Sequence, residues 1–160
     1  MKKKKRFYHI IFFLYGALML WLLFDRMPLD SDLSYWDQVA ANCNLQPLHT
    51  IFNYLDVLLR RAYYLEKWGL TSIYNFQARH AVINLAGNVV MFIPLGFLLP
   101  KVSARQRKLW RTLLTTALII LLVEILQLFS LRGSCDIDDV ILNTIGSALG
   151  YGFYALFRKK

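Results

Sequence analysis

Residues 112–130 read TLLTTALIILLVEILQLFS, and this stretch decides the fold class. A helix needs about 20 mostly apolar residues to cross the hydrocarbon core of a membrane. Three other stretches have a similar length and composition, at 7–24, 81–99 and 140–157. The sequence therefore predicts an all-α integral membrane protein, with four transmembrane helices in a single domain over residues 1–160.

The composition supports this prediction. The chain has 160 residues, of which 57% are hydrophobic and only 18% are charged, whereas soluble domains carry about 25% charged residues. Its mean hydropathy is +0.40. These values exclude a disordered chain, a collagen-like repeat and a disulfide-stapled small protein, and they argue against a soluble globule. The first apolar stretch is interpreted as a retained anchor, because it is long and Asp25 and Arg26 follow it directly.

Charge predicts the orientation. The N-terminal segment, the loop 100–111 and the tail 158–160 hold thirteen Lys and Arg residues and no Asp or Glu, while nine of the ten acidic residues lie in 25–80 and 131–139. Because short loops rich in Lys and Arg stay in the cytoplasm, we expect both termini on the cytoplasmic side of the membrane. The net charge of +9 is therefore interpreted as a topology signal, and no nucleic-acid partner is expected.

The segment 25–80 is expected outside. Within it, apolar residues recur at helical spacing over 48–68, which predicts one amphipathic helix in this first outer loop, lying on the membrane surface or covering the outer mouth of the bundle. Cys43 and Cys135 both fall on the same predicted side. They are either a disulfide of an oxidising compartment or two unconnected apolar side chains, because the sequence does not give their separation.

Polar residues interrupt the apolar spans at one level. Glu124 and Gln127 share a face of the third span, and Asn84 and Asn88 share a face of the second. Asn143 lies about one turn inside the fourth. At 1.5 Å per residue, Glu124, Asn84, Asn88 and Asn143 lie roughly 6–12 Å below the predicted outer surface. We expect one polar pocket beneath that surface, completed by the loop 131–139.

A purely structural interpretation competes with this pocket. Amide side chains in membrane helices often bind neighbouring helices, for about 0.6 kcal/mol each. Gly146 and Gly150 are expected to let two helices approach closely. Pro94 is expected to kink or loosen the inner end of the second span, since it removes a backbone hydrogen bond.

The ordered set of these residues resembles the VanZ-like family. The resembling parts are Asn84 to Asn88 running into Pro94 and Pro100, then Glu124 and Gln127, and then Arg132, Asp136, Asp139, Asn143, Gly146 and Gly150, with Asn44 to Pro47 earlier in the chain. The resemblance implies a small bacterial inner- or plasma-membrane protein. The founding member of the family is associated with resistance to teicoplanin, a lipoglycopeptide that binds cell-wall precursors. The resemblance implies no particular reaction.

Three hypotheses follow for the predicted pocket. In a membrane-embedded enzyme, Glu124 would be the general acid or base, Arg132 would hold a phosphate or carboxylate, and Asp136 and Asp139 would orient Arg132 or hold a divalent cation. The substrate would be positioned by Asn84, Asn88, Gln127, Asp136 and Asn143.

In a binding or shielding protein, the same pocket would hold an envelope lipid or the acyl tail of a drug without turnover. A transport component is the third hypothesis, disfavoured because the inner halves of the spans lack polar residues. Membrane lipids or a lipid-linked envelope precursor are the expected partners. Whether the protein is an enzyme, whether it holds a metal and its oligomeric state stay open.

Overall fold

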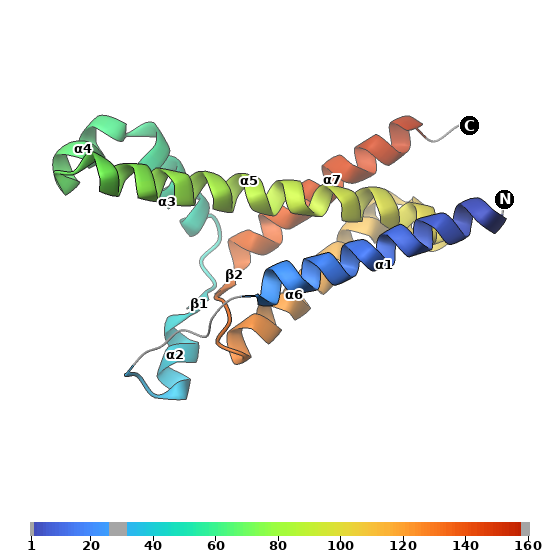
Figure 1. Cartoon of the computed structure of the whole chain (residues 1–160), viewed down its shortest axis with the longest axis horizontal. Coiled ribbons are helices and arrows are strands. Elements are labelled where there is room, and N and C mark those ends of the chain that lie inside the picture. The colour runs from blue at the N-terminus through green and yellow to red at the C-terminus, as the bar shows by residue number, and fades with distance from the viewer. Residues whose placement is uncertain (1, 26–31, 158–160) are drawn as a thin grey trace.

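A computed structural model describes residues 2–25 and 32–157 of the chain, with side chains from residue 5 onward. Figure 1 shows a bundle of helices. Within the described residues, four helices are long and apolar enough to cross a membrane, which confirms the prediction of four helical spans. They are α1 (Lys2–Phe24), α5 (Thr71–Val102), α6 (Leu109–Phe129) and α7 (Ile137–Phe157).

Shorter elements connect these spans. They are α2 (Tyr35–Ala41), β1 (Cys43–Asn44), α3 (His49–Leu59), α4 (Arg61–Trp68), the 3-10 helix η1 (Ala104–Arg107) and β2 (Cys135–Asp136). The strands β1 and β2 pair in parallel, which the sequence did not predict, because a two-residue strand is too short to show an alternating pattern. We call the end of the bundle that β1 and β2 form the bridge end. The first turn of α1 and the last turn of α7 lie together, away from it (Figure 1).

The helices α5 and α7 form the tightest contact between spans. A Cβ atom added to Gly146 would lie 2.0 Å from the carbonyl oxygen of Val89, and one added to Gly150 would lie 1.9 Å from that of Ile93. The backbones of the two helices therefore touch, and no side chain fits between them. This confirms the expected packing role of the two glycines.

The helices α6 and α1 contact the α5–α7 pair mainly through side chains. Helix α6 is fastened to α7 by a 2.8 Å hydrogen bond between the buried hydroxyls of Thr116 and Ser147. Helix α1 packs mainly on α5, where the Tyr15 hydroxyl donates to the carbonyl of Met91 at 2.8 Å. Most other side chains of α1 are exposed, as expected of a helix that faces lipid on most sides.

The segment expected as one amphipathic helix over 48–68 is instead two helices. Helix α3 ends at Leu59 and α4 begins at Arg61, with Arg60 between them in a non-helical conformation. Neither glycine nor proline marks this break in the sequence. The end of α4 does carry a signal, since Gly69 has a φ of 68°, a left-handed conformation typical of a residue that terminates a helix.

The helix that contains the second predicted span begins at Thr71, ten residues before Ala81. Polar residues over 71–80 hide this part from a hydropathy search, but the helix forms there because α3 and α4 pack against it. Tyr74 is buried as a result, and its ring lies 6.5 Å from that of Trp68. Figure 1 shows this part of α5 running alongside α3 and α4, beyond the four-helix bundle. Further along, α5 stays helical through Pro94.

Candidate functional site

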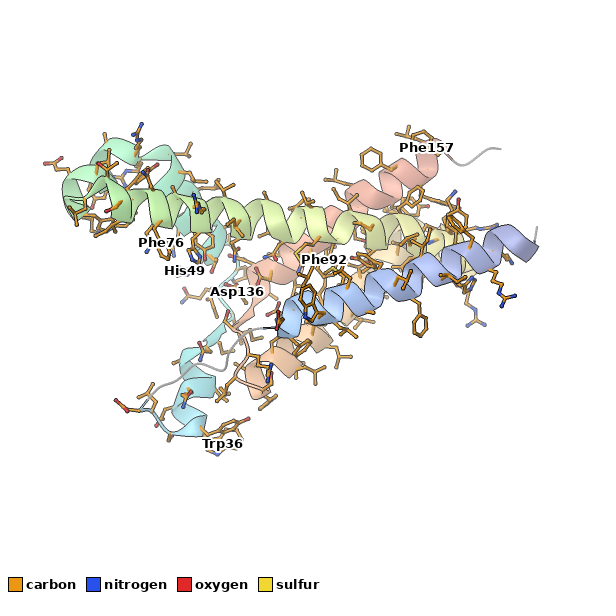
Figure 2. All side chains as sticks on the ribbon, in the orientation of Figure 1. Trp36, His49, Phe76, Phe92, Asp136 and Phe157 are labelled. Atoms are coloured by element: carbon orange, nitrogen blue, oxygen red, sulfur yellow. The ribbon has the colours of Figure 1, made fainter. Side chains whose placement is uncertain are left out.

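Asp136, labelled in Figure 2, is the centre of a hydrogen-bond network at the bridge end. Its side chain is 8% exposed. One carboxylate oxygen accepts from the hydroxyl of Thr50 at 2.6 Å and from the amide of Asn44 at 3.3 Å. The other accepts from the backbone N–H of Asp138 at 2.9 Å. Asp136 thus ties the start of α7 to β1 and to the first turn of α3.

Glu124 reaches the same network from α6. Its side chain is 4% exposed, and Oε2 accepts a hydrogen bond from the backbone N–H of Asp136 at 3.1 Å. The acid inside the third span therefore points at the segment before α7 and not at surrounding lipid. The structure brings Glu124 and Asp136 together, as we expected from their positions along the spans.

Asp138 is completely buried and binds the start of α3. Its two carboxylate oxygens accept from the backbone N–H groups of Leu48 and Ile51. A carboxylate at this position satisfies donors that a helix leaves unpaired and interacts favourably with the helix dipole. We call Asn44, Thr50, Glu124, Asp136 and Asp138 the bridge cluster.

Asp139 lies beside the bridge cluster on its α5 side. Its carboxylate accepts a hydrogen bond from the side-chain amide of Asn88, which links α7 to α5. Tyr54 of α3 is close to both acids of this region, since burial, followed by the charges of Asp139 and Asp136, raises the pKa of its hydroxyl. Asn88 and Asp139, both residues of the predicted site, are thus brought together, although the sequence did not predict this pair.

Asn84 and Asn143 each have a side-chain oxygen that lacks a hydrogen bond within the described residues. Both oxygens are buried. Asn143 is 3% exposed. Buried polar atoms nearly always have a partner, so these oxygens are acceptors available to a water molecule or a ligand donor.

Gln127 and Arg132 turn toward the end of α1. The Gln127 amide donates to the carbonyl of Leu23 at 2.7 Å, and the Arg132 guanidinium donates to the carbonyl of Phe24 at 2.9 Å. The last carbonyls of a helix lack partners within it, and these two side chains supply them. We expected Arg132 to meet the aspartates of its own loop, but its described hydrogen bond goes to α1.

The acidic residues that the structure describes are not grouped as metal ligands. Among residues 2–25 and 32–157, no group of three or more His, Cys, Asp and Glu side chains is placed to hold a metal ion. Asp136 binds Thr50 and Asn44, whereas Asp139 binds Asn88. The divalent cation expected between the two aspartates therefore stays a prediction without support from a ligand group.

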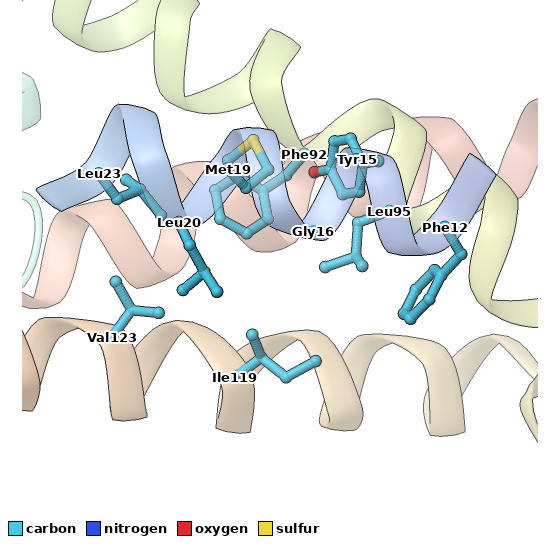
Figure 3. A pocket seen from close by; sticks show the side chains of 10 residues that line it. All are labelled: Phe12, Tyr15, Gly16, Met19, Leu20, Leu23, Phe92, Leu95, Ile119 and Val123. Atoms are coloured by element: carbon cyan, nitrogen blue, oxygen red, sulfur yellow. The ribbon is translucent and has the colours of Figure 1, made fainter. Parts of the chain in front are cut away.

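An apolar cavity of about 230 Å³ lies between α1, α5 and α6, and Figure 3 shows the side chains around it. The sequence predicted a polar pocket, whereas this cavity is lined by carbon atoms. It nevertheless adjoins the polar groups, since Leu23 precedes the capped end of α1 and Val123 precedes Glu124. The lining residues are Phe12, Tyr15, Gly16, Met19, Leu20, Leu23, Phe92, Leu95, Ile119 and Val123.

The predicted site did not include three residues of the bridge cluster, which are Asn44, Thr50 and Asp138. The sequence did contain a feature that could have identified Asn44, because this residue begins the short motif that ends at Pro47. Asp138 had a weaker one, as a third carboxylate beside two predicted site residues. Thr50 had none, because a single threonine near a helix start is too common to indicate a contact with α7.

Comparisons with known proteins add a family to this geometry. The family model described as VanZ/LLP1 matches residues 12–158. Protein VanZ of Enterococcus faecium is 28% identical over 116 residues, which cover 66% of this chain and 71% of that protein. No solved structure matches.

Proposed function

We propose that this chain, which belongs to the VanZ/LLP1 family, is a plasma-membrane protein that binds a lipid-linked component of the cell envelope without turning it over. One hydrocarbon chain of that component would occupy the cavity between α1, α5 and α6. Its polar end would lie at the bridge end, which in this proposal faces outward and leaves both termini in the cytoplasm.

The cavity is the observation that carries the proposal. A lining of carbon atoms offers a ligand burial of apolar surface, worth roughly 25 cal/mol per Å², and nothing that would hold a polar group. Its volume of about 230 Å³ is below the range of about 300–1,000 Å³ that holds a drug-sized molecule. It therefore fits part of a ligand, such as one alkyl or isoprenoid chain, better than a whole glycopeptide.

The groups at the outer end of the cavity suit an anionic head group. Leu23 lines the cavity, and the next residue, Phe24, accepts a hydrogen bond from the guanidinium of exposed Arg132. The positive charge of Arg132 is thus held beside the end of α1. A guanidinium binds phosphate and carboxylate groups with planar, paired hydrogen bonds.

Binding has more support than catalysis, because the bridge cluster is occupied with holding the fold. Asp138 binds the start of α3, Asp136 binds side chains of β1 and α3, and Glu124 accepts a backbone N–H. A general acid or base must instead reach the proton that it transfers. In this proposal, Glu124 stabilises the bridge end and performs no chemistry.

The link to resistance is part of the same proposal. The founding member of the family is associated with resistance to teicoplanin, and a lipoglycopeptide and a lipid-linked precursor both carry a hydrocarbon chain. We therefore expect cells that contain this protein to be less susceptible to teicoplanin than matched cells without it.

A tryptophan that fills the cavity tests the proposal. Ile119→Trp enlarges a side chain that lines the cavity, whereas Leu118→Trp adds a tryptophan one residue away, outside the lining. Native mass spectrometry of the purified proteins should show bound lipid on the wild type and on Leu118→Trp, and a loss of most of it on Ile119→Trp. Equal lipid on all three proteins would reject the cavity as the binding site.

Glu124→Gln tests the catalytic alternative. This change keeps the size of the side chain and removes its ability to act as a carboxylic acid. Lipid extracts of cells with the wild type, with Glu124→Gln and without the protein should contain the same lipid species. A species that requires both the protein and an intact Glu124 would establish an enzyme instead.

A further inference from the structure

The only two cysteines of the chain face each other across the bridge between β1 and β2. Cys43 is the register partner of Cys135 in the parallel pair, although 91 residues separate them in the sequence. Paired strands lie about 4.8 Å apart, within the range of about 4.4–6.8 Å between the Cα atoms of a disulfide. The thiols are also close enough for Cys43 to raise the pKa of the Cys135 thiol.

We infer that Cys43 and Cys135 form a disulfide that locks the bridge end, with an oxidised protein dithiol of the cell envelope as the oxidant. In the structure both residues are thiols, which is the reduced state of this pair. The inference rests on the outward orientation of the bridge end proposed above, but not on any ligand in the cavity.

The disulfide would form in two steps, and the exposure of the two cysteines determines which of them reacts first. Cys43 is exposed and Cys135 is buried. The thiolate of Cys43 attacks a sulfur of the oxidant, which forms a mixed disulfide and releases one thiolate of the oxidant. Cys135 then loses its proton, attacks the sulfur of Cys43 and expels the second thiolate. Two electrons and two protons pass to the oxidant, which becomes a dithiol.

The thiol of Cys135 suits this second role. Its burial, followed by the nearby Cys43 and Glu124, raises its pKa from 9.0 to about 11. Cys135 therefore stays protonated near neutral pH and is a poor first nucleophile, since the thiolate is the reactive form. In the mixed disulfide, the sulfur of Cys43 is held beside it, so the second step is intramolecular.

The disulfide would fix the residues that build the bridge cluster. Asn44 and Asp136 are the next pair in the same strands, and the N–H of Cys135 donates to the carbonyl of Asn42 at 2.8 Å. A covalent bond at this point ties the segment before α3 to the segment before α7. It therefore holds Asp136 where its N–H reaches Glu124.

Counting thiols in cells tests the inference. Cells are lysed in a denaturant that contains N-ethylmaleimide, so that buried as well as exposed free thiols are blocked. The excess reagent is removed, disulfides are reduced, and the thiols released by reduction are labelled with a polyethylene-glycol maleimide. Wild-type protein should gain two labels, and the single variants Cys43→Ser and Cys135→Ser should gain none. Wild-type protein that gains no label would overturn the inference.

A second labelling separates a failed disulfide from a failed orientation. In Cys135→Ser, the remaining thiol of Cys43 is exposed to a maleimide that does not cross membranes. Labelling of intact cells supports the outward orientation; if the wild type is nevertheless reduced, the disulfide is rejected while the proposed function stands. Labelling only after the membrane is opened overturns the orientation, and the disulfide with it.

Discussion

The two sides of α5 differ in how closely they are packed. On one side, α5 meets α7 through Gly146 and Gly150, so closely that the backbones touch. On the other side, α1 and α6 leave an apolar cavity against the same helix. We conclude that the protein combines a rigid pair of helices with a more loosely attached α1. A ligand that enters from the membrane would displace lipid near α1 and would leave the α5–α7 pair unchanged.

Gly146→Ala should break the rigid side and have the largest effect. The new Cβ would lie 2.0 Å from the carbonyl oxygen of Val89, so the helices must separate. Overpacking of this kind costs about 1–3 kcal/mol and sometimes more. Gly152→Ala on the same helix is the control, because no atom of the described residues lies within 4 Å of its added Cβ. Equal melting temperatures of the two variants in detergent would show that the close contact is absent.

Asp138→Ala should loosen the bridge end without separating α5 from α7. The backbone N–H groups of Leu48 and Ile51 lose their acceptor, and the loss of each hydrogen bond costs about 1 kcal/mol. Limited proteolysis should then cut the α3 region faster than in the wild type. Asp37→Ala, at an exposed position near the start of α2, should leave the cutting rate unchanged. The same rate for both variants would contradict the role of Asp138.

Gln127→Leu should weaken the attachment of α1 to the bundle and leave the contact between α5 and α7 unchanged. The carbonyl of Leu23 loses the hydrogen bond from the Gln127 amide, which is worth about 1 kcal/mol. Amide hydrogen exchange should therefore become faster in the last turn of α1 and stay unchanged along α7. Faster exchange in both helices to the same degree would mean that the two sides are not independent.

The smallest effect concerns the titration of Cys135. In Cys43→Ser, one of the causes that raise the pKa of the Cys135 thiol is removed, while burial and Glu124 remain. The rate of alkylation should therefore keep rising with pH above 9.0, the ordinary value, with a midpoint below about 11. Free cysteine under the same conditions is the reference. A midpoint at or below 9.0 would show that Cys135 is not buried beside the bridge cluster.

Hydropathy predicted the four spans because a helix that crosses the hydrocarbon core must be long enough and mostly apolar. It could not predict that α5 begins at Thr71, since that part is helical through its contacts with α3 and α4. The break at Arg60 was missed for a similar reason, because no residue type in the sequence marks it.

For the polar site, the sequence predicted only how deep each polar side chain lies in the membrane, and not which partner it binds. Side chains at one level of the membrane must find partners, which brings Glu124 to Asp136 and Asn88 to Asp139. Which partner each one finds depends on loop geometry. Arg132 therefore binds α1, and Asp138 binds the start of α3.

The most direct test of the account is a photo-crosslink from inside the cavity. Benzoylphenylalanine replaces Leu20, which lines the cavity, or Leu22, which lies on the same helix outside the lining. After illumination of membranes, mass spectrometry identifies the attached lipids. The account predicts one selected lipid class at position 20 and the bulk membrane mixture at position 22. The same bulk mixture at both positions would contradict it.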